Sequence, residues 1–530
     1  MTATQQGTGT ECRDDRCILS IDCGTQSVRG LVFDCNGHIL AKHKVEFEPY
    51  VSPVPGYAEH PAGDFWRDAC MALQSLKTEA PLAWKRIAAV TVTTQRDTVV
   101  PLDTNGMPLR PAIVWLDQRM ARCDKPMPAM DRLQFRLVGM TKAVEMSRRK
   151  GKDNWMVENE PDLWARTAKW LLLSGYFCYR LTGQYVDSVA SQIGHIPFDY
   201  AARGWPSKPG SWRWHMFSAR RDQLPDLVEA GQQMGTVSAQ AAAETGLPEG
   251  LPVIAAGSDK GCETLGVGCV DPRSVSLSFG TTATIQTTSK TYFEPIAFMP
   301  PYPASVKGCF NPEVEIFRGY WMVSWFKKEF AVREAVEAAE RGVHPEVVLD
   351  EHLQDVPPGS QGLMLQPYWG PGLKMPEAKG SMIGFGDVHT RAHVYRAIIE
   401  GIGYALLEGL EQIERKSGKA VEKVMVSGGG SQSNAICQIT ADMFNRPVLR
   451  SETYETSGLG AAINGFVGIG LYATHEEAAS RMVRAADTFV PRAEAAALYH
   501  DLYMRVYRHI YPALRPVYRE IQRITHYPEI

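Results

Sequence analysis

The segment from Cys17 to Cys35, CILSIDCGTQSVRGLVFDC, constrains the fold of this chain more than any other stretch. Its apolar run from Ile18 predicts a buried strand, and the turn that follows predicts a second apolar strand that returns beside the first. Asp22 interrupts the first strand just before the turn, where a carboxylate is costly unless a cation or a hydroxyl meets it. The segment therefore predicts a hairpin with a metal nearby, although an ordinary hairpin would show the same pattern.

The turn of this hairpin has the composition of a phosphate-binding loop. Gly24 permits a positive φ and close approach of the backbone to a ligand. The amides and hydroxyls of the next three residues can then wrap an anion such as phosphate. Those residues are Thr25, Gln26 and Ser27.

A second hairpin of the same kind lies half a chain later. The stretch from Ser274 to Thr287, SVSLSFGTTATIQT, again reads as a strand, a turn and a strand, and its turn contains Gly280, Thr281 and Thr282. Two such hairpins predict two similar domains that face each other and hold a polyphosphate from both sides. A duplicated clamp of this kind is hard to explain by packing alone.

Length and composition favour a two-domain protein that acts on small molecules. The chain has 530 residues, of which 44% are hydrophobic, so two large domains are expected, at 17–270 and at 271–530 with a helical tail. A formal net charge of -3 argues against a broad nucleic-acid-binding face. No apolar run suits a membrane helix, and residues 1–16 lack the apolar centre of a signal peptide. We expect a cytoplasmic protein with no nucleic-acid or membrane partner, and a homodimer remains an open option.

Metal-binding patterns of the zinc type are missing from the sequence. The 11 cysteines are scattered, which fits reduced thiols better than a disulfide framework, and the 13 histidines form no HExxH pattern. The nearest cysteine pair, Cys12 and Cys17, has no second pair to complete a site. Magnesium remains the expected metal, because phosphate chemistry brings oxygen ligands of its own.

Polar residues follow a short buried strand that the sequence predicts from Ile87. The strand ends in Gln95, Arg96 and Asp97, at the kind of strand end where ligand groups gather in open α/β sheets. A donor beside an acceptor suits adjacent hydroxyl groups of a polyol. A surface salt bridge between Arg96 and Asp97 is the alternative explanation.

Another predicted strand, from Leu251, leads into a carboxylate between glycines. Asp259 lies between Gly257 and Gly261, and a carboxylate at a buried strand end can accept the proton of an attacking substrate hydroxyl. An Asx turn would use the same residue types. Because the second phosphate hairpin starts about 15 residues later, we interpret Asp259 as a catalytic base.

The remaining sequence supplies a third glycine-rich turn and several predicted helices. Gly428, Gly429 and Gly430 precede a helix that begins near Asn434, which leaves room for a nucleobase or a ribose. Apolar spacing predicts an amphipathic helical region over 161–183. Residues 124–162, rich in Lys, Arg, Met and Pro, are interpreted as a lid or an inserted lobe.

Taken in order, these motifs resemble the FGGY carbohydrate kinase family. The order is IDCGTQS, TTQRD, GSDKGCETLGVG, SLSFGTT, GSMIGF with HVYRAIIEGIGYAL, and VSGGGSQSN, and the resemblance spans about 17–510. It implies an α/β fold of two actin-like (ribonuclease H-like) domains with a central cleft, and ATP and Mg2+ between the domains. It also implies that Asp259 is the general base, that Asp22 lies near the metal, that Thr25 and Thr281 lie near the phosphates, and that Gly428 to Gly430 lie near the adenosine.

The residues expected to contact the substrate depart from the family's patterns. Gln95-Arg96-Asp97 is similar to the Gln-Arg-Glu of glycerol kinases and unlike the Gln-Met-His of typical xylulokinases. Lys260 follows the expected base where glycerol kinases usually carry Gln and xylulokinases Asn, and it could pair with Asp259 or contact the substrate. The region 141–155 lacks the usual Pro-x-x-Lys-Leu pattern.

The sequence thus predicts an ATP-dependent kinase for a hydroxyl of a small sugar or polyol, such as a pentulose. A kinase for glycerol or another short polyol, and a catalytically silent sugar-binding regulator of the same fold, are the alternatives. An actin-type chaperone or filament protein would share both hairpins but needs no hydroxyl-binding acid such as Asp259.

Overall fold

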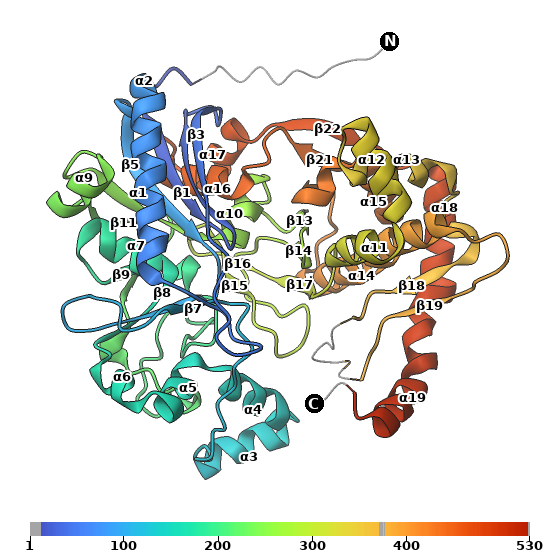
Figure 1. Cartoon of the computed structure of the whole chain (residues 1–530), viewed down its shortest axis with the longest axis horizontal. Coiled ribbons are helices and arrows are strands. Elements are labelled where there is room, and N and C mark those ends of the chain that lie inside the picture. The colour runs from blue at the N-terminus through green and yellow to red at the C-terminus, as the bar shows by residue number, and fades with distance from the viewer. Residues whose placement is uncertain (1–11, 370–374, 376, 528–530) are drawn as a thin grey trace.

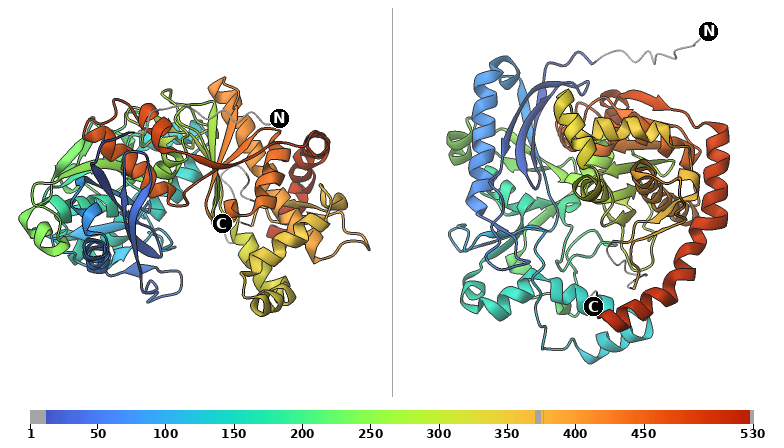
Figure 2. Two further views of the ribbon diagram at one scale, coloured as in Figure 1. Left: turned by 90° about the horizontal axis from the view of Figure 1, so that it is seen from above. Right: turned by 45° about the vertical axis from the view of Figure 1, so that its right-hand side comes forward.

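The computed structural model describes residues 12–369, 375 and 377–527, which build two mixed six-stranded sheets (Figures 1 and 2). In the first sheet the spatial order of the strands is β11-β12-β5-β1-β2-β3. Their bounds are β11 Gln233–Thr236, β12 Pro252–Ser258, β5 Ile87–Thr94, β1 Cys17–Cys23, β2 Ser27–Phe33 and β3 Ile39–Glu46. In the second sheet the order is β17-β14-β13-β20-β21-β22. Their bounds are β17 Glu313–Ile316, β14 Ala283–Gln286, β13 Ser274–Phe279, β20 Lys423–Ser427, β21 Val448–Ser451 and β22 Ala485–Phe489.

The two sheets have the same topology. In the first, β1 pairs antiparallel with β2 and parallel with β5, and β5 pairs parallel with β12. In the second, β13 pairs antiparallel with β14 and parallel with β20, and β20 pairs parallel with β21. An antiparallel edge strand, β11 or β22, completes each sheet. The duplication that the two hairpins predict is therefore present, and the fold is the expected actin-like two-domain α/β fold.

Helices cover both faces of the first sheet, and every residue of its strand β1 is therefore buried. Leu19 and Ile21 pack with α1 (Ala62–Glu79) and α7 (Leu173–Thr182) in one core cluster. Ile18 packs in another cluster with Ile463 and Phe466 of α16 (Thr456–Gly468). A strand that carries apolar residues on both faces has to lie in the middle of such a layered sheet.

The second half of the chain supplies one covering layer of the first sheet. Helix α16 packs against β1, β5 and β12, and most closely against α10 (Asp259–Gly266). The chain then returns to the second sheet through α17 (His475–Met482) and β22. A division of the chain at 270/271 remains a prediction. The structure adds that residues 456–482, from the second half of the chain, pack on the first sheet.

The prediction of one continuous helical region over 161–183 was wrong. The segment folds as α6 (Pro161–Arg166), β8 (Lys169–Leu172) and α7. Strand β8 pairs antiparallel with β6 (Val99–Leu102), in a four-stranded sheet of order β4-β7-β6-β8. Backbone pairing with a distant strand overrides the helical spacing of the apolar residues here.

Residues 124–160 form a helical lobe at the lower edge of the view in Figure 1. It consists of α3 (Ala129–Leu137), α4 (Thr141–Lys150) and α5 (Lys152–Asn159). Helices α14 (Arg391–Ser417) and α15 (Asn434–Phe444) contribute to the core of the second sheet, and the tail ends in α18 (Ala493–Leu502) and α19 (Arg508–Thr525). The shorter elements are α2 Pro81–Trp84, β4 Glu59–His60, β7 Ala112–Ile113, α8 Trp212–Met216, β9 Val186–Ser188, α9 Ala239–Thr245, β10 Asp226–Val228, β15 Tyr302–Pro303, β16 Phe310–Asn311, α11 Trp321–Phe330, α12 Val332–Arg341, α13 Pro345–Asp355, β18 Met364–Gln366 and β19 Ser381–Ile383. Among the described residues, no helix has both the length and the apolar content to cross a membrane.

Candidate functional site

The candidate residues of the first sheet gather at the carboxyl ends of three parallel strands. Asp22 is opposite Thr93 in the pairing of β1 with β5, and Ser258 is opposite Thr94 in the pairing of β12 with β5. Asp22, Gln95 and Asp259 therefore lie at the same edge, which is where open α/β sheets bind ligands. Asp259 is close enough to Asp22 to raise the pKa of that carboxyl.

Asp259 is the first residue of α10. Ser258 caps the N-terminus of this helix by accepting a hydrogen bond from the Gly261 amide. The Asp259 side chain accepts the Lys260 amide at 2.7 Å. Burial raises the pKa of Asp259, and the charges of Arg96 and Lys260 oppose that rise. A buried carboxylate that keeps a raised pKa is suited to act as a general base.

Lys260 does not form the expected salt bridge with Asp259. Its ammonium lies 2.8 Å from Glu263 Oε2 and 2.5 Å from Ser278 Oγ. Glu263 also accepts hydrogen bonds from Ser278 Oγ at 2.9 Å and Ser427 Oγ at 2.7 Å. Ser278 lies near the end of β13, and Ser427 is the last residue of β20. This cluster therefore joins α10 to the two central strands of the second sheet. Lys260 still affects Asp259 through its charge, which opposes the rise of the Asp259 pKa.

Arg96 is directed away from its neighbour Asp97 and toward the second sheet. Its guanidinium donates to Glu313 Oε2 at 2.9 Å and to Ser258 Oγ at 3.2 Å, and lies 4.9 Å from the centre of the Tyr302 ring. The side chain is 18% exposed and that of Glu313 is 7% exposed, so the ion pair is buried between the two sheets. The alternative explanation of Arg96 and Asp97, a surface salt bridge between these two residues, is thus ruled out.

Asp97 has a left-handed backbone, with φ +50°, and its carboxylate is held by two cationic or polar side chains. Oδ2 lies 3.0 Å from Lys152 Nζ and 2.9 Å from His195 Nδ1, and Oδ1 accepts the His195 amide at 3.0 Å. Burial tends to raise the Asp97 pKa, but Lys152 and His195 together hold it well below its usual range. Asp97 is therefore ionised at neutral pH and orients Lys152 and His195 rather than Arg96.

The first glycine turn contacts the same region. Gly24 N donates to Ser27 O at 3.0 Å, which closes the turn between β1 and β2. Thr25 Oγ1 donates to Gln95 Oε1 at 3.2 Å and accepts the Trp115 indole N–H at 2.9 Å. Gln26 is exposed, whereas Ser27 is buried at the start of β2. The structure thus brings Thr25 and Gln95 together, beside Asp22.

The turn of the second hairpin and the triple glycine lie at the ends of β13 and β20. Gly280 is near Lys260, since a Cβ atom at position 280 would lie 3.9 Å from Lys260 Nζ. Thr281 is exposed, and Thr282 Oγ1 donates to Phe317 O at 3.3 Å. Gly428 has φ +80°, and a Cβ atom at Gly430 would lie 2.8 Å from the Tyr320 ring. Asn434 is exposed at the start of α15.

Comparison with protein families decides what this arrangement belongs to. The family described as "FGGY family of carbohydrate kinases, N-terminal domain" matches residues 17–266, and the corresponding C-terminal domain matches residues 275–469. The chain belongs to the FGGY family of carbohydrate kinases.

Known members of the FGGY family align with this chain over nearly its whole length. It is 29% identical over 492 residues to the uncharacterized sugar kinase YgcE of Escherichia coli (strain K12), covering 93% of this chain and 92% of that protein. It is 28% identical over 518 residues to the xylulose kinase of Lactococcus lactis, covering 96% and 98%. The crystal structure of the xylulose kinase of Rhodospirillum rubrum superposes with a TM-score of 0.81 at 26% identity, covering 95% and 100%.

This FGGY protein is therefore a sugar kinase, and ATP is the co-substrate that membership implies. Asp22 has the character of a carboxylate that a cation would complete: it is buried, its pKa is raised to about 7 by burial, and Arg29, 3.3 Å away, offsets that only in part. Within the described residues, no group of three or more His, Cys, Asp or Glu side chains is placed to hold a metal. Magnesium fits such a site, because it is commonly held by one or two carboxylates, waters and substrate phosphates.

Several residues at this site were missed from the sequence. Glu263, Glu313, Lys152 and His195 complete the contacts of the predicted residues and come from four different elements or loops. Only Glu263 carries a local signal, because it follows Asp259 at i+4 on one helix. Lys152 lies in region 141–155, which departs from the family pattern, and its partner Asp97 is 55 positions earlier in the chain.

Proposed function

We propose that this FGGY kinase transfers the γ-phosphoryl group of ATP to a hydroxyl of a ketose, with a pentulose such as xylulose as the leading candidate. The observation that carries the proposal is the row of Asp22, Gln95, Asp97 and Asp259 along one sheet edge, with the second glycine turn beside Lys260. Phosphoryl transfer needs little covalent chemistry, so positioning and charge stabilisation do most of the work.

Asp259 accepts the proton of the substrate hydroxyl as that oxygen attacks the γ-phosphorus. Its burial favours proton uptake, and its position on the first residue of α10 fixes it against the strand edge. The bond from the γ-phosphorus to the bridging oxygen of ATP breaks, and ADP leaves. Asp22 would help to hold Mg2+, which would supply positive charge to neutralise the ATP phosphates.

Lys260 brings a cation close to the second phosphate turn, since a Cβ atom at position 280 would lie 3.9 Å from its Nζ. An ammonium group has three donors, and Glu263 and Ser278 use two of them. Burial lowers the Lys260 pKa, but the charges of Glu263 and Asp259 raise it by more, so the side chain stays protonated. The third N–H is then available to the transferred group, between Asp259 and the turn at Gly280.

The donors around Asp97 favour a ketose over glycerol. The edge with Asp97 and Asp259 also carries Lys152, His195 and Gln95, and Gln95 Nε2 is buried without a partner among the described residues. A three-carbon polyol has too few oxygens to satisfy this set, whereas a pentulose offers a carbonyl and four hydroxyls. Two relatives named as xylulose kinases support the same candidate.

A single substrate screen tests this proposal. ADP release is measured with ATP and Mg2+ for pentuloses, hexuloses, tetritols and glycerol, each over a range of concentrations. We expect the highest kcat/KM for a pentulose. A higher kcat/KM for glycerol would contradict the ketose assignment, and sugar binding without ADP release would support the catalytically silent regulator.

A further inference from the structure

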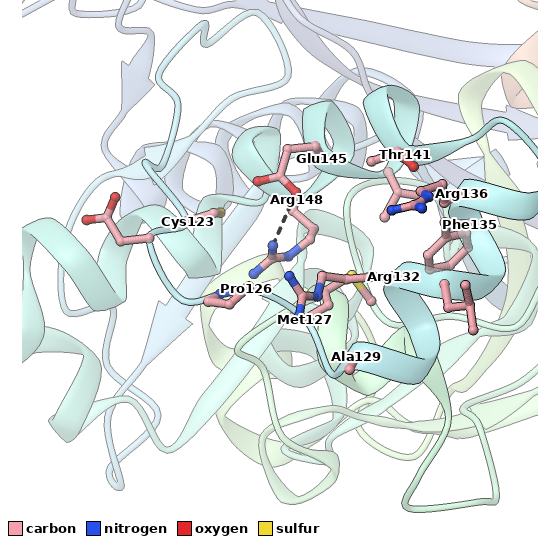
Figure 3. Close-up of a pocket in the computed structure, with 13 residues that line it drawn as sticks. Cys123, Pro126, Met127, Ala129, Arg132, Phe135, Arg136, Thr141, Glu145 and Arg148 are labelled. Atoms are coloured by element: carbon pink, nitrogen blue, oxygen red, sulfur yellow. Dashed lines mark hydrogen bonds and ion pairs between the residues drawn. The ribbon is translucent and has the colours of Figure 1, made fainter.

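Helices α3 and α4 enclose a pocket of about 520 Å3 in the lobe, apart from the strand-end site (Figure 3). We call it the arginine pocket, because three arginines line it together with apolar side chains and the hydroxyl of Thr141. The arginines are Arg132 and Arg136 of α3 and Arg148 of α4. The function proposed above uses none of them.

Two of these arginines have no counterion. Arg132 and Arg136 are exposed and four residues apart on one helix, and neither guanidinium has a hydrogen bond or an ion pair among the described residues. The nearby acids have other partners: Asp131 binds His215 at 2.6 Å and Glu145 binds Arg148 at 3.3 Å. Asp124, which also lines the pocket, lies 3.7 Å from Arg122. Like charges at i and i+4 destabilise a helix, and an anion between them would relieve that cost.

Arg148 adds a buried donor that lacks a partner. The side chain is 9% exposed, Nη1 bonds to Glu145 and Nη2 donates to Lys125 O at 2.8 Å. Its Nε atom is buried with no hydrogen-bond partner in the described structure. A buried N–H without an acceptor is costly. In Figure 3 the Arg132 and Arg148 guanidinium groups point toward the same region of the pocket, while Arg136 lies beside Thr141.

The start of α4 adds a third favourable feature for an anion. Thr141 is its first residue, the preceding Met140 supplies no side-chain cap, and its first turn carries no acidic residue. The amides of that turn are therefore available, and the helix dipole favours a negative charge there. The N-terminal end of α4 thus complements Arg136 at the same side of the pocket.

We propose that the arginine pocket binds the phosphate group of a small organic phosphate. Arginine binds phosphate bidentately, and two guanidinium groups without counterions match a dianionic phosphate better than a monocarboxylate. Met127, Phe135 and Val144 provide an apolar wall for the rest of the ligand. Trp212 packs edge-on against Phe135, with ring centres 5.2 Å apart, so its fluorescence reports on the pocket.

Calorimetry with inorganic phosphate and with phenyl phosphate tests the site. The kinase is first saturated with Mg2+ and a non-hydrolysable ATP analogue, so that its own phosphate site is filled. We expect saturable binding, tighter for phenyl phosphate because of the apolar wall. Binding of phenyl phosphate that is no tighter than that of phosphate would overturn the assignment to an organic phosphate, and no saturable binding of either would overturn the site.

Variants then locate the binding. Arg132→Gln with Arg136→Gln removes two exposed charges and should weaken binding about tenfold or more, since charge-assisted hydrogen bonds are lost. Arg148→Gln should weaken it as well, but the exposed pair keeps the test valid if that buried variant folds poorly. Arg333→Gln, an exposed arginine of α12, is the matched control and should bind as the parent does. Unchanged affinity in the double variant would overturn the proposal.

Binding of a phosphate in the arginine pocket should also change the KM for the sugar. Helix α4 ends at Lys150, and Lys152, two residues later, holds Asp97. If the sugar is bound beside Asp97, as proposed above, phenyl phosphate should change the KM for the sugar in the parent and not in the Arg132→Gln, Arg136→Gln variant. An equal change in both proteins would overturn this coupling, while the calorimetric result would stand apart from it.

Discussion

At the scale of single residues, the proposed general base is Asp259. Replacement by Asn keeps the shape and removes the base, so kcat should fall by about 10²–10⁴-fold, with a smaller change in the KM for the sugar. The measurement is initial-rate kinetics of ADP release with the best substrate of the screen. Asp501→Asn, an exposed aspartate of α18, is the control and should leave kcat unchanged. Turnover of Asp259→Asn close to that of the parent would remove Asp259 from the mechanism.

If Asp22 holds magnesium, as proposed above, the affinity for Mg2+ should depend on pH. Burial raises its pKa to about 7, so below that pH the carboxyl is largely protonated and a cation must displace the proton. The sign follows: affinity is highest above about pH 7 and should fall by about tenfold for each pH unit below it. Mg2+ titrations of the rate at about pH 6 and about pH 8 measure this. Asp22→Asn should bind Mg2+ weakly at both values, and a parent whose Mg2+ affinity is equal at both would contradict the role.

The residues found from the sequence are those whose signal is local. Asp22 is the last residue but one of β1, and Gln95 and Asp259 directly follow β5 and β12, so each polar residue interrupts an apolar run at a recognisable place. Glu313 and His195 give no such signal, because their partners Arg96 and Asp97 are about 217 and 98 positions away. Only the fold brings these charges together. Lys260 shows a different limit, because two acids lie close to it in sequence, and it pairs with Glu263 and not with the adjacent Asp259.

At the scale of elements, the contact between α10 and α16 positions the base. The two helices approach so closely that a Cβ atom at Gly460 would lie 1.9 Å from Cys262 O, and one at Gly266 1.9 Å from Thr456 O. Ser457 Oγ also donates to Asp259 O at 3.2 Å. Because the opposing atoms are backbone, a side chain here has to push the helices apart.

Gly460→Ala should therefore destabilise the protein by about 1–3 kcal/mol through overpacking, and should lower kcat because α10 carries Asp259. Thermal unfolding and steady-state kinetics measure the two effects. Gly63→Ala is the matched control, because a Cβ atom at this helical position of α1 meets nothing within 4 Å. That change should stabilise the protein by about 0.5–1 kcal/mol through helix propensity. Equal melting temperatures for both variants would contradict the close contact.

The elements that the sequence predicted correctly are those whose signal lies in residues adjacent in the chain. Helix α15 begins at Asn434, as predicted, and the adjacent Ser433 caps it by accepting a hydrogen bond from the Ile436 amide. Strand β8 was predicted as helix, because apolar residues such as Trp170 and Leu172 suit a buried helix as well as a buried strand. Its pairing with the distant strand β6 decides between the two conformations.

At the scale of the whole molecule, two duplicated sheets share one site because a few charges link them. The link at Lys260, Glu263, Ser278 and Ser427 joins α10 to the second sheet. The link at Arg96 and Glu313 joins the end of β5 to β17. The duplication itself was predictable from two hairpins, whereas the return of α16 to the first sheet was not, since its small residues suit any close helix contact.

The ion pair of Arg96 and Glu313 should couple sugar binding to the second sheet. Glu313→Gln leaves the Arg96 charge buried with a neutral partner, and truncating one side of a buried charge pair commonly costs tenfold or more in affinity. We expect the KM for the sugar to rise by about that factor, with a smaller change in the KM for ATP, in steady-state kinetics.

Glu315→Gln, two residues along β17, is the matched comparison, because it removes the neighbouring charge and leaves the pair. Burial, with the charge of Glu313, raises the pKa of Glu315 to about 7. A raised pKa in the folded state means that stability is lost as pH rises from about 4.5 to about 7. Glu315→Gln should therefore melt at a higher temperature than the parent at about pH 8, at a similar one at about pH 4, and with an unchanged KM for the sugar. If both variants raised that KM equally, loss of negative charge on β17 would explain the effect, and the specific pairing of Arg96 with Glu313 would not be needed.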